Sequence, residues 1–439
     1  MFEVFRNAWK ITELKKKILY TLLILVLFRV GAAVPVPFLD SSIISQMVGN
    51  NGSLLGFINV MSGGAFANAT VFALSISPYI TSSIVIQLLA VAIPALERLS
   101  KEGEDGRKKL ETITRYTTIA LALIQAVAYY IVLRNYGAVK YASGFSGVLA
   151  LLTIVTVFTA GSMVVMWLGE RIDDKGIGNG ISMILFAGIV SRGPSAVITL
   201  YTYFADYGIR GLAMGTEGAL KYVIFVPVLI IIYIALVVSI VVMNAAERRI
   251  PVQYAKRVVG RKVYGGQSSN IPIKVMMSGV LPIIFASSIV SIPSTIGGFL
   301  TLKEGTFWHS FFKVLNYDSW LYAILYFILI IAFNYFYVAI QYNPVEMANN
   351  LQKNNGAIPG IRPGKPTSTF ISKVISKITL VGALFLAVLA ILPIGLGAIS
   401  GMNVSLSGTT IIIVVGVALD TTRELESQMM MRHYKGFLE

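Results

Sequence analysis

Long apolar runs separated by short polar segments dominate the pattern of this chain. About ten of these runs reach roughly 17–25 residues, the length at which a helix crosses the hydrocarbon core of a bilayer. Strand-like alternation is absent from the runs, and backbone groups in lipid must find hydrogen bonds within their own segment, so we predict transmembrane helices. The ten predicted spans cover residues 18–37, 70–93, 117–133, 150–169, 180–200, 221–243, 275–299, 319–341, 374–395 and 405–425.

Composition agrees with a polytopic membrane protein. Of the 439 residues, 56% are hydrophobic and 13% are charged, and the mean hydropathy is +0.75, whereas soluble domains carry about 25% charged residues. The first run follows Lys15, Lys16 and Lys17, but it is longer than a signal-peptide core of about 7–15 residues, so we expect a retained helix. Cysteine is absent, and His309 and His433 lie outside the runs, so no cofactor or metal site is expected.

The basic residues are unevenly placed. With the N-terminus in the cytoplasm, ten spans return the C-terminus to the same side, and most of the 36 Lys and Arg residues then lie in cytoplasmic segments. The positive-inside rule therefore favours cytoplasmic termini.

Two of the basic segments, 244–274 and 342–378, are long enough to be functional loops. The second is rich in Gly and Pro and includes Arg362. The first holds one acid near its start, Glu247, and six candidates for partner binding: Arg248, Arg249, Lys256, Arg257, Arg261 and Lys262. These loops either fix the topology and contact anionic lipid, or bind an anionic partner such as ribosomal RNA or an acidic motor surface.

Two stretches look like nucleotide-binding motifs without meeting their spacing. In GIRPGKPT only three residues separate Gly360 from Gly364, where the phosphate-binding loop needs four, and Pro366 takes the position of its Ser or Thr. In GIGNGIS, at 176–182, Asn179 is better interpreted as the N-cap of the following helix. We predict no catalytic site, because the chain shows neither a nucleotide site nor a nucleophile–base pair.

Charge inside the runs is nearly absent. Only Arg29 and Asp420 qualify, whereas ion-coupled transporters usually carry intramembrane acids. This scarcity of charge weighs against a secondary transporter with inverted repeats, which composition and topology still permit as the rival interpretation. An enzyme embedded in the membrane is a further rival, without a candidate nucleophile–base pair.

The second and seventh runs share a short internal echo. FALSISPYITSSIVIQLL at 72–89 and LPIIFASSIVSIP at 281–293 each contain Pro followed by Ser-Ser-Ile-Val. These runs are five spans apart, so they would occupy equivalent positions in two successive halves of five spans each. Because five is an odd number, the halves would have opposite orientations in the membrane and form an inverted repeat. Their hydroxyls allow either ordinary close packing or a weakly hydrogen-bonded seam, at about 0.6 kcal/mol per bond.

Nearly the whole chain resembles the SecY family, the channel subunits of the bacterial Sec protein translocon. The resemblance rests on FINVMSGGAFANATVFALSISPYITSSIVIQLL (57–89), KEGEDGRKKLETITRYTT (101–118) and WLGERIDDKGIGNGIS (167–182). It continues through YAKRVVGRKVYGGQSSNIPIKV (254–275), GVLPIIFASSI (279–289), NPVEMANNLQKNNGAIPGIRPGKPT (343–367) and LVGALFLAVLAILP (380–393).

The resemblance implies an all-α polytopic fold of ten helices in two inverted halves, residues 1–200 and 201–439, around an hourglass pore. The waist of that pore is a ring of six aliphatic side chains, which motif matching assigns to Ile76, Ile80, Ile181, Leu185, Leu281 and Ile413. An aliphatic ring excludes ions by dewetting and forms no specific hydrogen bonds with a passing polypeptide.

The resemblance also implies two moving parts. A plug in the outer funnel corresponds to about 55–66, with Leu55, Gly56, Phe57, Ile58, Asn59, Val60, Met61, Ser62, Gly63 and Gly64 as its residues, although their composition fits a plain loop as well. A lateral gate between the second and seventh spans would use Ser82, Ser83, Gln87, Met276, Ser287 and Ser288. Relatives commonly carry Asn where this chain has Met276, which predicts a less tightly held gate.

The implied partners are SecE and SecG in the membrane, and the SecA motor and the ribosome at the basic loops. Arg362 matches a functionally sensitive loop arginine. Signal sequences, secretory polypeptides and the lipid bilayer are the other expected partners, and the location implied is the bacterial cytoplasmic membrane.

Overall fold

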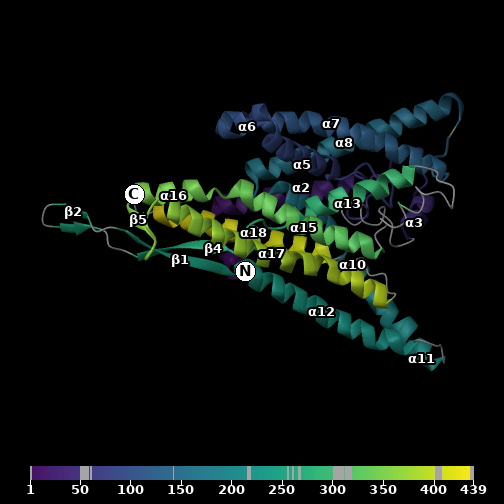
Figure 1. Cartoon of the computed structure of the whole chain (residues 1–439). Coiled ribbons are helices and arrows are strands. Elements are labelled where there is room, and N and C mark those ends of the chain that lie inside the picture. The colour runs from purple at the N-terminus through teal and green to yellow at the C-terminus, as the bar shows by residue number, and fades with distance from the viewer. Residues whose placement is uncertain are drawn as a thin grey trace.

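The computed structural model describes most of the chain and is drawn in Figure 1. The described residues are 2–49, 59, 62–141, 143–214, 219–254, 257–259, 262–264, 268–299, 311, 319–400 and 408–435.

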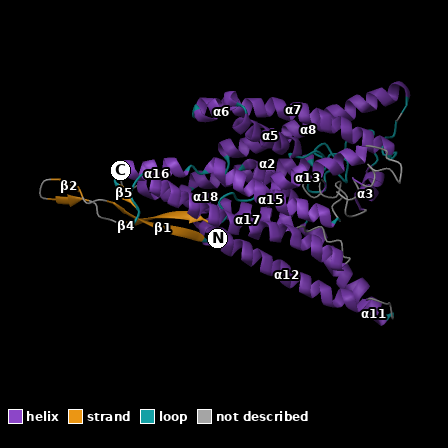
Figure 2. Cartoon of the chain, viewed as in Figure 1, coloured by secondary structure: helices purple, strands orange, loops and turns teal. Residues whose placement is uncertain are grey.

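Helices form nearly all of the regular structure (Figure 2). In the N-terminal part they are α1 (Phe2–Lys10), α2 (Thr12–Gly31), α3 (Ser41–Gly49), α5 (Ser77–Ala92), α6 (Pro94–Lys101), α7 (Glu104–Asn135), α8 (Gly144–Lys175), α9 (Gly180–Val190) and α10 (Gly193–Thr202). A π-helical segment, Tyr203–Arg210, leads into α11 (Gly211–Ala213) and α12 (Ala219–Ala245). The C-terminal helices are α13 (Leu281–Phe299), α15 (Trp320–Gln341), α16 (Pro344–Lys353), α17 (Lys365–Ser400) and α18 (Gly408–Lys435).

The all-α polytopic class is confirmed, whereas the number of spans stays a prediction. Among the described residues, six helical stretches are long and apolar enough to cross a membrane, or seven if the pair α5 and α6 counts as one span. That pair bends by 101° at Ile93–Pro94. Helices also occupy the predicted first and last spans, as α2 and α18, but each carries several charged residues.

The two helices that contain the internal echo begin later than the sequence predicts. Expected starts at residues 70 and 275 become Ser77 in α5 and Leu281 in α13. A proline is the second residue of each helix, where its missing N–H and fixed φ are well tolerated. Residues 62–76 form successive turns instead, and their backbone is partly satisfied by residues 34–36, as in the bond from Val71 N to Val34 O at 2.9 Å.

The helices gather into two groups that meet at two places. In one group α8 packs against α2, α7 and α9, and α7 packs against α5; in the other α17 packs against α15, α16 and α18, and α18 against α12. The groups are joined where α13 contacts α5 and α7, and where α18 contacts α9 and α1. In Figure 1, α5 to α8 accordingly lie above α12, α15, α17 and α18.

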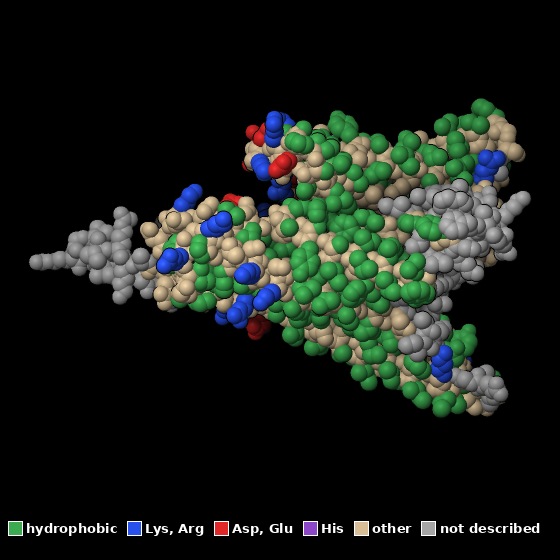
Figure 3. All heavy atoms as spheres, in the orientation of Figure 1, with side chains coloured by type: hydrophobic (Ala, Val, Ile, Leu, Met, Phe, Trp, Pro, Cys, Tyr) green, Lys and Arg blue, Asp and Glu red, His purple; other side chains and the backbone are tan. Residues whose placement is uncertain are grey.

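One large apolar core lies between the two groups. It combines buried side chains of α2, α5, α8 and α9 with those of α12, α13, α15, α17 and α18. Outward faces are apolar too: Val26 on α2 is 61% exposed and Ile231 on α12 is 65% exposed, as expected of surfaces that contact lipid. In Figure 3 apolar side chains cover the broad middle of the visible face, and Lys and Arg gather at the end that carries α16.

Five short strands within the described residues were not predicted. β1 (Glu247–Tyr254) pairs with β4 (Ser268–Lys274) and with β5 (Gly356–Ala357), while β2 (Arg257–Val259) pairs with β3 (Lys262–Tyr264). Strands of both basic loops therefore share one three-stranded sheet, in the order β4-β1-β5, while β2 and β3 form a separate two-stranded sheet; the strands project from one end of the helices (Figures 1 and 2).

Candidate functional site

The six proposed ring residues belong to one apolar cluster. Ile76, Ile80, Leu185 and Ile413 are buried within it, and Ile181 and Leu281 are partly buried against it. They come from four elements: the start of α5, α9, the start of α13, and α18. We refer to this set of six as the waist, and to the large apolar core that contains it as the waist cluster.

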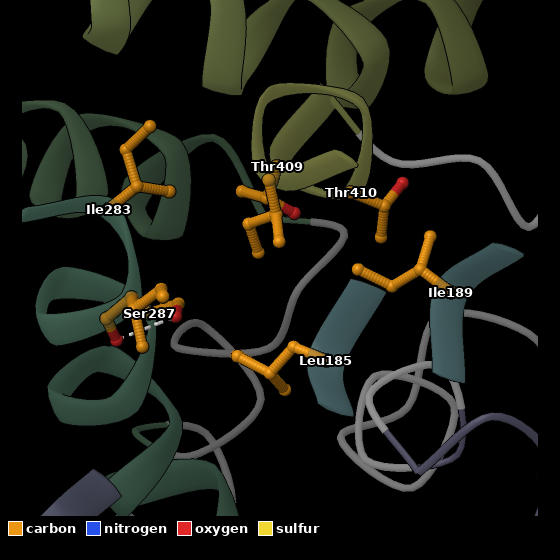
Figure 4. A pocket seen from close by; sticks show the side chains of 8 residues that line it. Leu185, Ile189, Ile283, Ser287, Thr409 and Thr410 are labelled. Atoms are coloured by element: carbon orange, nitrogen blue, oxygen red, sulfur yellow. Dashed lines mark hydrogen bonds between the residues drawn. The ribbon is translucent and has the colours of Figure 1, made fainter. Parts of the chain in front are cut away.

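Two of the waist residues border a small pocket. The pocket lies between α9, α13 and α18 and has room for about one water molecule. Leu185 and Ile413 line it together with six residues that the sequence did not single out as ring members: Ile189, Ile283, Ile284, Ser287, Thr409 and Thr410. Figure 4 shows Leu185 and Ile189 on α9 across the pocket from Ile283 and Ser287 on α13.

One of the pocket residues that the sequence analysis missed, Ile189, could have been found from its spacing along the helix. Ile189 follows Leu185 by four residues, as Leu185 follows Ile181, so helical spacing alone extends that face of α9. The sequence offered no comparable sign for Thr409 and Thr410, near the start of α18, because they border a segment with no distinctive pattern.

The position of α9 depends on a close approach to α8. A Cβ atom added to Gly180 would lie 1.9 Å from the carbonyl oxygen of Gly169, which no side chain could tolerate. Two further bonds fix this start of the helix: Gly180 N donates to Asp173 Oδ1 at 2.8 Å, and Ser182 N donates to Asn179 Oδ1 at 3.0 Å. The predicted N-cap at Asn179 is therefore confirmed, and the cap aims Ile181 into the waist cluster.

Four of the proposed plug residues are described, and they are held in place by local bonds. Asn59 Oδ1 accepts from Ala67 N at 2.9 Å, and Ser62 Oγ accepts from Phe66 N at 3.2 Å. Gly63 O accepts from Arg29 Nη1 at 3.3 Å, and Gly64 has φ +90°, which favours glycine. The remaining plug candidates, Leu55, Gly56, Phe57, Ile58, Val60 and Met61, lie outside the described residues.

The turns that lead from these residues to the waist are unusual. Ala69 and Ser75 both adopt φ +50°, a left-handed conformation that is uncommon without glycine. Ser75 is 2% exposed and its hydroxyl has no hydrogen-bond partner, while its carbonyl accepts from Ser162 Oγ on α8 at 3.2 Å. A strained backbone and a buried hydroxyl without a partner, directly before Ile76, are typical of a segment whose conformation matters to function.

The proposed gate residues lie on both sides of the contact between α5 and α13. Ser82 is fully buried, but its hydroxyl donates to Thr114 O at 2.9 Å and so ties α5 to α7. Gln87 Nε2 donates to Ser83 Oγ at 3.2 Å, within α5. On α13, Ser287 and Ser288 both donate to Ile284 O.

Met276 precedes α13 and is 6% exposed within the waist cluster. Its side chain therefore adds apolar contact beside the start of α13.

The sheet presents arginines on a rigid support. Arg248 and Arg249 are exposed on β1, and Arg249 pairs with Glu247 at 2.7 Å. Beneath them Ile250, Val252, Ile273, Leu351 and Ile358 belong to a separate apolar core that α15 and α17 complete. We refer to β1, β4 and β5 with this core as the platform.

The other basic candidates are described to different extents. Arg362 is exposed in a turn between Gly360 and Gly364, which have φ +80° and +96°. Arg257 and Lys262 belong to the paired strands β2 and β3, whereas Lys256 and Arg261 lie outside the described residues.

Chemically, the arrangement offers a dry apolar constriction and a charged surface. Among the described residues no group of three or more His, Asp or Glu side chains could hold a metal ion. The waist can separate aqueous spaces, and the platform can attract an anionic macromolecule.

Comparison with known proteins gives consistent results. The family model described as SecY matches residues 70–422. Two similar relatives, each named protein translocase subunit SecY, come from Streptomyces galbus and Halalkalibacterium halodurans; both are 41% identical, over 454 and 446 residues, with full coverage of both chains.

Solved structures share the fold at lower identity. One is described as the structure of a protein conducting channel; it has a TM-score of 0.63 and 19% identity, covering 94% of this chain and 92% of that chain. Another is Sec61 in the canine ribosome–channel complex, with a TM-score of 0.60, 17% identity and the same coverage.

Proposed function

The chain belongs to the SecY family, and from this premise we propose that it forms a protein-conducting channel. It moves unfolded secretory polypeptides across the bacterial cytoplasmic membrane and releases apolar helices sideways into the bilayer. Its relatives carry the name of a translocase subunit over their full length, which supports this function.

The observation that carries the proposal is the convergence of four separate elements on one aliphatic waist. Residues as far apart in sequence as Ile76 and Ile413 share a single buried cluster, and the pocket that Leu185 and Ile413 help to line has room for about one water molecule. The idealised cost of moving an ion out of water is on the order of 20 kcal/mol, so such a constriction seals without a charged gate. The same side chains can part around a polypeptide of any sequence.

Two further elements complete the channel. The segment around Asn59 to Gly64 closes the outer funnel as a plug, and its bond to Arg29 supports a closed resting position. α5 and α13 form the lateral gate between two inverted halves, residues 1–200 and 201–439; the paired proline starts of these helices support the pseudo-symmetry.

Partners supply the driving energy. The platform, with Arg248, Arg249 and Arg362 exposed, binds the ribosome or the SecA motor on the cytoplasmic side, where both termini also lie. SecE and SecG complete the membrane complex, with SecE holding the halves together.

The experiment is reconstitution of the chain with these partners in liposomes, followed by motor-driven import of a secretory protein. We expect the imported protein to become protected from added protease. Absence of protection, combined with gradient-driven uptake of a small solute, would favour a secondary transporter instead.

A further inference from the structure

Two adjacent residues in the C-terminal part of α18, Arg423 and Glu424, form hydrogen bonds to both halves of the molecule. We refer to these bonds together as the grip. Arg423 donates from Nη1 to Asn244 Oδ1 at 2.8 Å and from Nη2 to Asn244 O at 2.6 Å. Glu424 Oε2 accepts from Gly178 N at 3.1 Å. Successive residues of a helix point about 100° apart, so the two side chains reach different neighbours.

The arginine side of this grip holds the base of the platform. Asn244 is 6% exposed near the C-terminus of α12, and β1 begins only three residues later. Ala246 O, between them, accepts from Val275 N at 2.9 Å, which closes the base of the β1–β4 pair.

The glutamate side holds the segment that leads into α9. Gly178 precedes the waist residue Ile181 by three positions and has φ +83°. Its neighbour Ile177 is 3% exposed, and Ile177 N donates to Thr21 Oγ1 on α2 at 3.0 Å. α2 and α18 therefore fix consecutive amides of the same short segment.

Glu424 is itself held in position. Gln428 Nε2 donates to Glu424 Oε1 at 3.0 Å, and Lys17 Nζ on α2 donates to Gln428 Oε1 at 3.2 Å. Leu425, which is 1% exposed, packs between Ile177 and Leu14 beside these polar groups. A carboxylate with both oxygens engaged in this way has a defined orientation, and charge-assisted bonds of this kind are the stronger ones.

α9 and α18 also meet at two other points: Thr421 Oγ1 on α18 donates to Met183 Sδ on α9 at 3.6 Å, and Leu185 and Ile413 line one pocket together. We propose that Glu424 is a positioning residue for the waist. Its bond to Gly178 N fixes the axial position of α9 relative to α18, so that the Leu185 side chain lies opposite the Ile413 side chain. This inference rests on the proposed channel function, because it assigns Glu424 to the seal of that channel.

The test compares variants that cut the two sides of the grip separately. Glu424→Ala removes the α9 side, Arg423→Ala removes only the platform side, and Glu424→Gln keeps an oxygen acceptor for Gly178 N. Exposed Glu426→Ala, two residues on, controls for loss of an acidic side chain.

Two readouts are measured for each variant in liposomes that hold the resting channel complex. One is ion influx, and the other is disulfide yield in a Leu185→Cys/Ile413→Cys background, which is feasible because the chain lacks cysteine. For Glu424→Ala we expect about a tenfold rise in influx, the factor that corresponds to losing about 1.4 kcal/mol from one charge-assisted bond. Disulfide yield falls in parallel, and the other three variants stay near the unsubstituted level.

Equal leak from Arg423→Ala and Glu424→Ala would overturn the proposal, because it would indicate general loosening of α18. So would an unchanged seal in Glu424→Ala. If that variant fails to fold, Glu424→Asp, which keeps the charge but shortens its reach, is measured instead; a seal equal to that of the unsubstituted chain contradicts the proposal. Absence of the disulfide in the Cys background alone would instead count against the waist itself, and hence against the proposed function.

Discussion

The waist is assembled from four elements spread over most of the chain, whereas the platform is built on two basic loops, each of which carries exposed arginine. At the waist, function depends on apolar side chains that exclude water, and a single charge is out of place there. On the platform, apolar residues serve only as a base, and function depends on charges that stay in solvent. Screening by salt weakens the exposed charges and leaves the buried apolar contacts nearly unchanged.

This difference implies that the two regions fail in different ways. Substitutions at the waist should open the resting seal, while substitutions on the platform should slow partner-driven transport without a leak. The following predictions test that separation.

The largest effect is expected from Ile80→Asp. Ile80 is 6% exposed in the waist cluster, and an unpaired carboxylate there carries a desolvation penalty of several kcal/mol unless water enters. We expect ion influx into liposomes to rise by about a hundredfold or more, as water follows the charge. Ile80→Leu, which conserves volume, is the control and should remain sealed; an equally tight Ile80→Asp channel would argue against a dewetted waist.

A smaller effect, on folding, is expected from Gly180→Ala. The added methyl group would lie 1.9 Å from Gly169 O and force α9 away from α8, at a cost of about 1–3 kcal/mol. Thermal unfolding in detergent should show a lower transition temperature. Gly169→Ala is the matched control, because its added Cβ meets its nearest atom at an ordinary 3.5 Å. Similar transition temperatures for the two variants would mean that the helix approach does not position α9.

Arg362→Glu should leave the seal intact and reduce motor-driven transport by about tenfold, since it reverses an exposed charge that is available for binding. Transport is measured as protease-protected secretory protein, at low and high salt. Arg362→Lys retains the charge and should lose less. A leak without loss of transport would contradict the division of roles.

The smallest effects are expected from two adjacent methionines that belong to different cores. Met276 lies in the waist cluster and Met277, 8% exposed, lies in the platform core. Met276→Asn should raise signal-sequence stringency by about threefold, in keeping with interhelical hydrogen bonds worth about 0.6 kcal/mol. Met277→Asn should instead lower stability without altering stringency. If both variants change stringency alike, the two cores are not separable.

Sequence pattern predicted the helices well but placed the starts of α5 and α13 too early. The spans follow from runs of apolar residues, but α5 and α13 begin at Ser77 and Leu281, because turns buried in protein replace helix before each proline. Those turns are as apolar as the helices that follow them, so hydropathy cannot distinguish the two.

The platform was missed for a related reason. Pairing of Gln253 with Ala357 joins loops about a hundred residues apart, and no local pattern records such a partner.

The candidate site shows the same limit. Resemblance supplied the ring residues, and local rules supplied Asn179 as a cap, but the bond from Ser82 to α7 depends on tertiary packing.

The most direct measurement is crosslinking of a secretory polypeptide halted during transport. A single cysteine is placed at position 80 (Ile80→Cys), and in a second preparation at lipid-facing position 26 (Val26→Cys), where the side chain is 61% exposed on α2. The halted polypeptide carries one cysteine, and both preparations are oxidised. We predict a disulfide to position 80 and none to position 26. No disulfide at position 80, with the polypeptide shown to be halted inside the complex, would contradict the assignment of the waist as the path of the polypeptide.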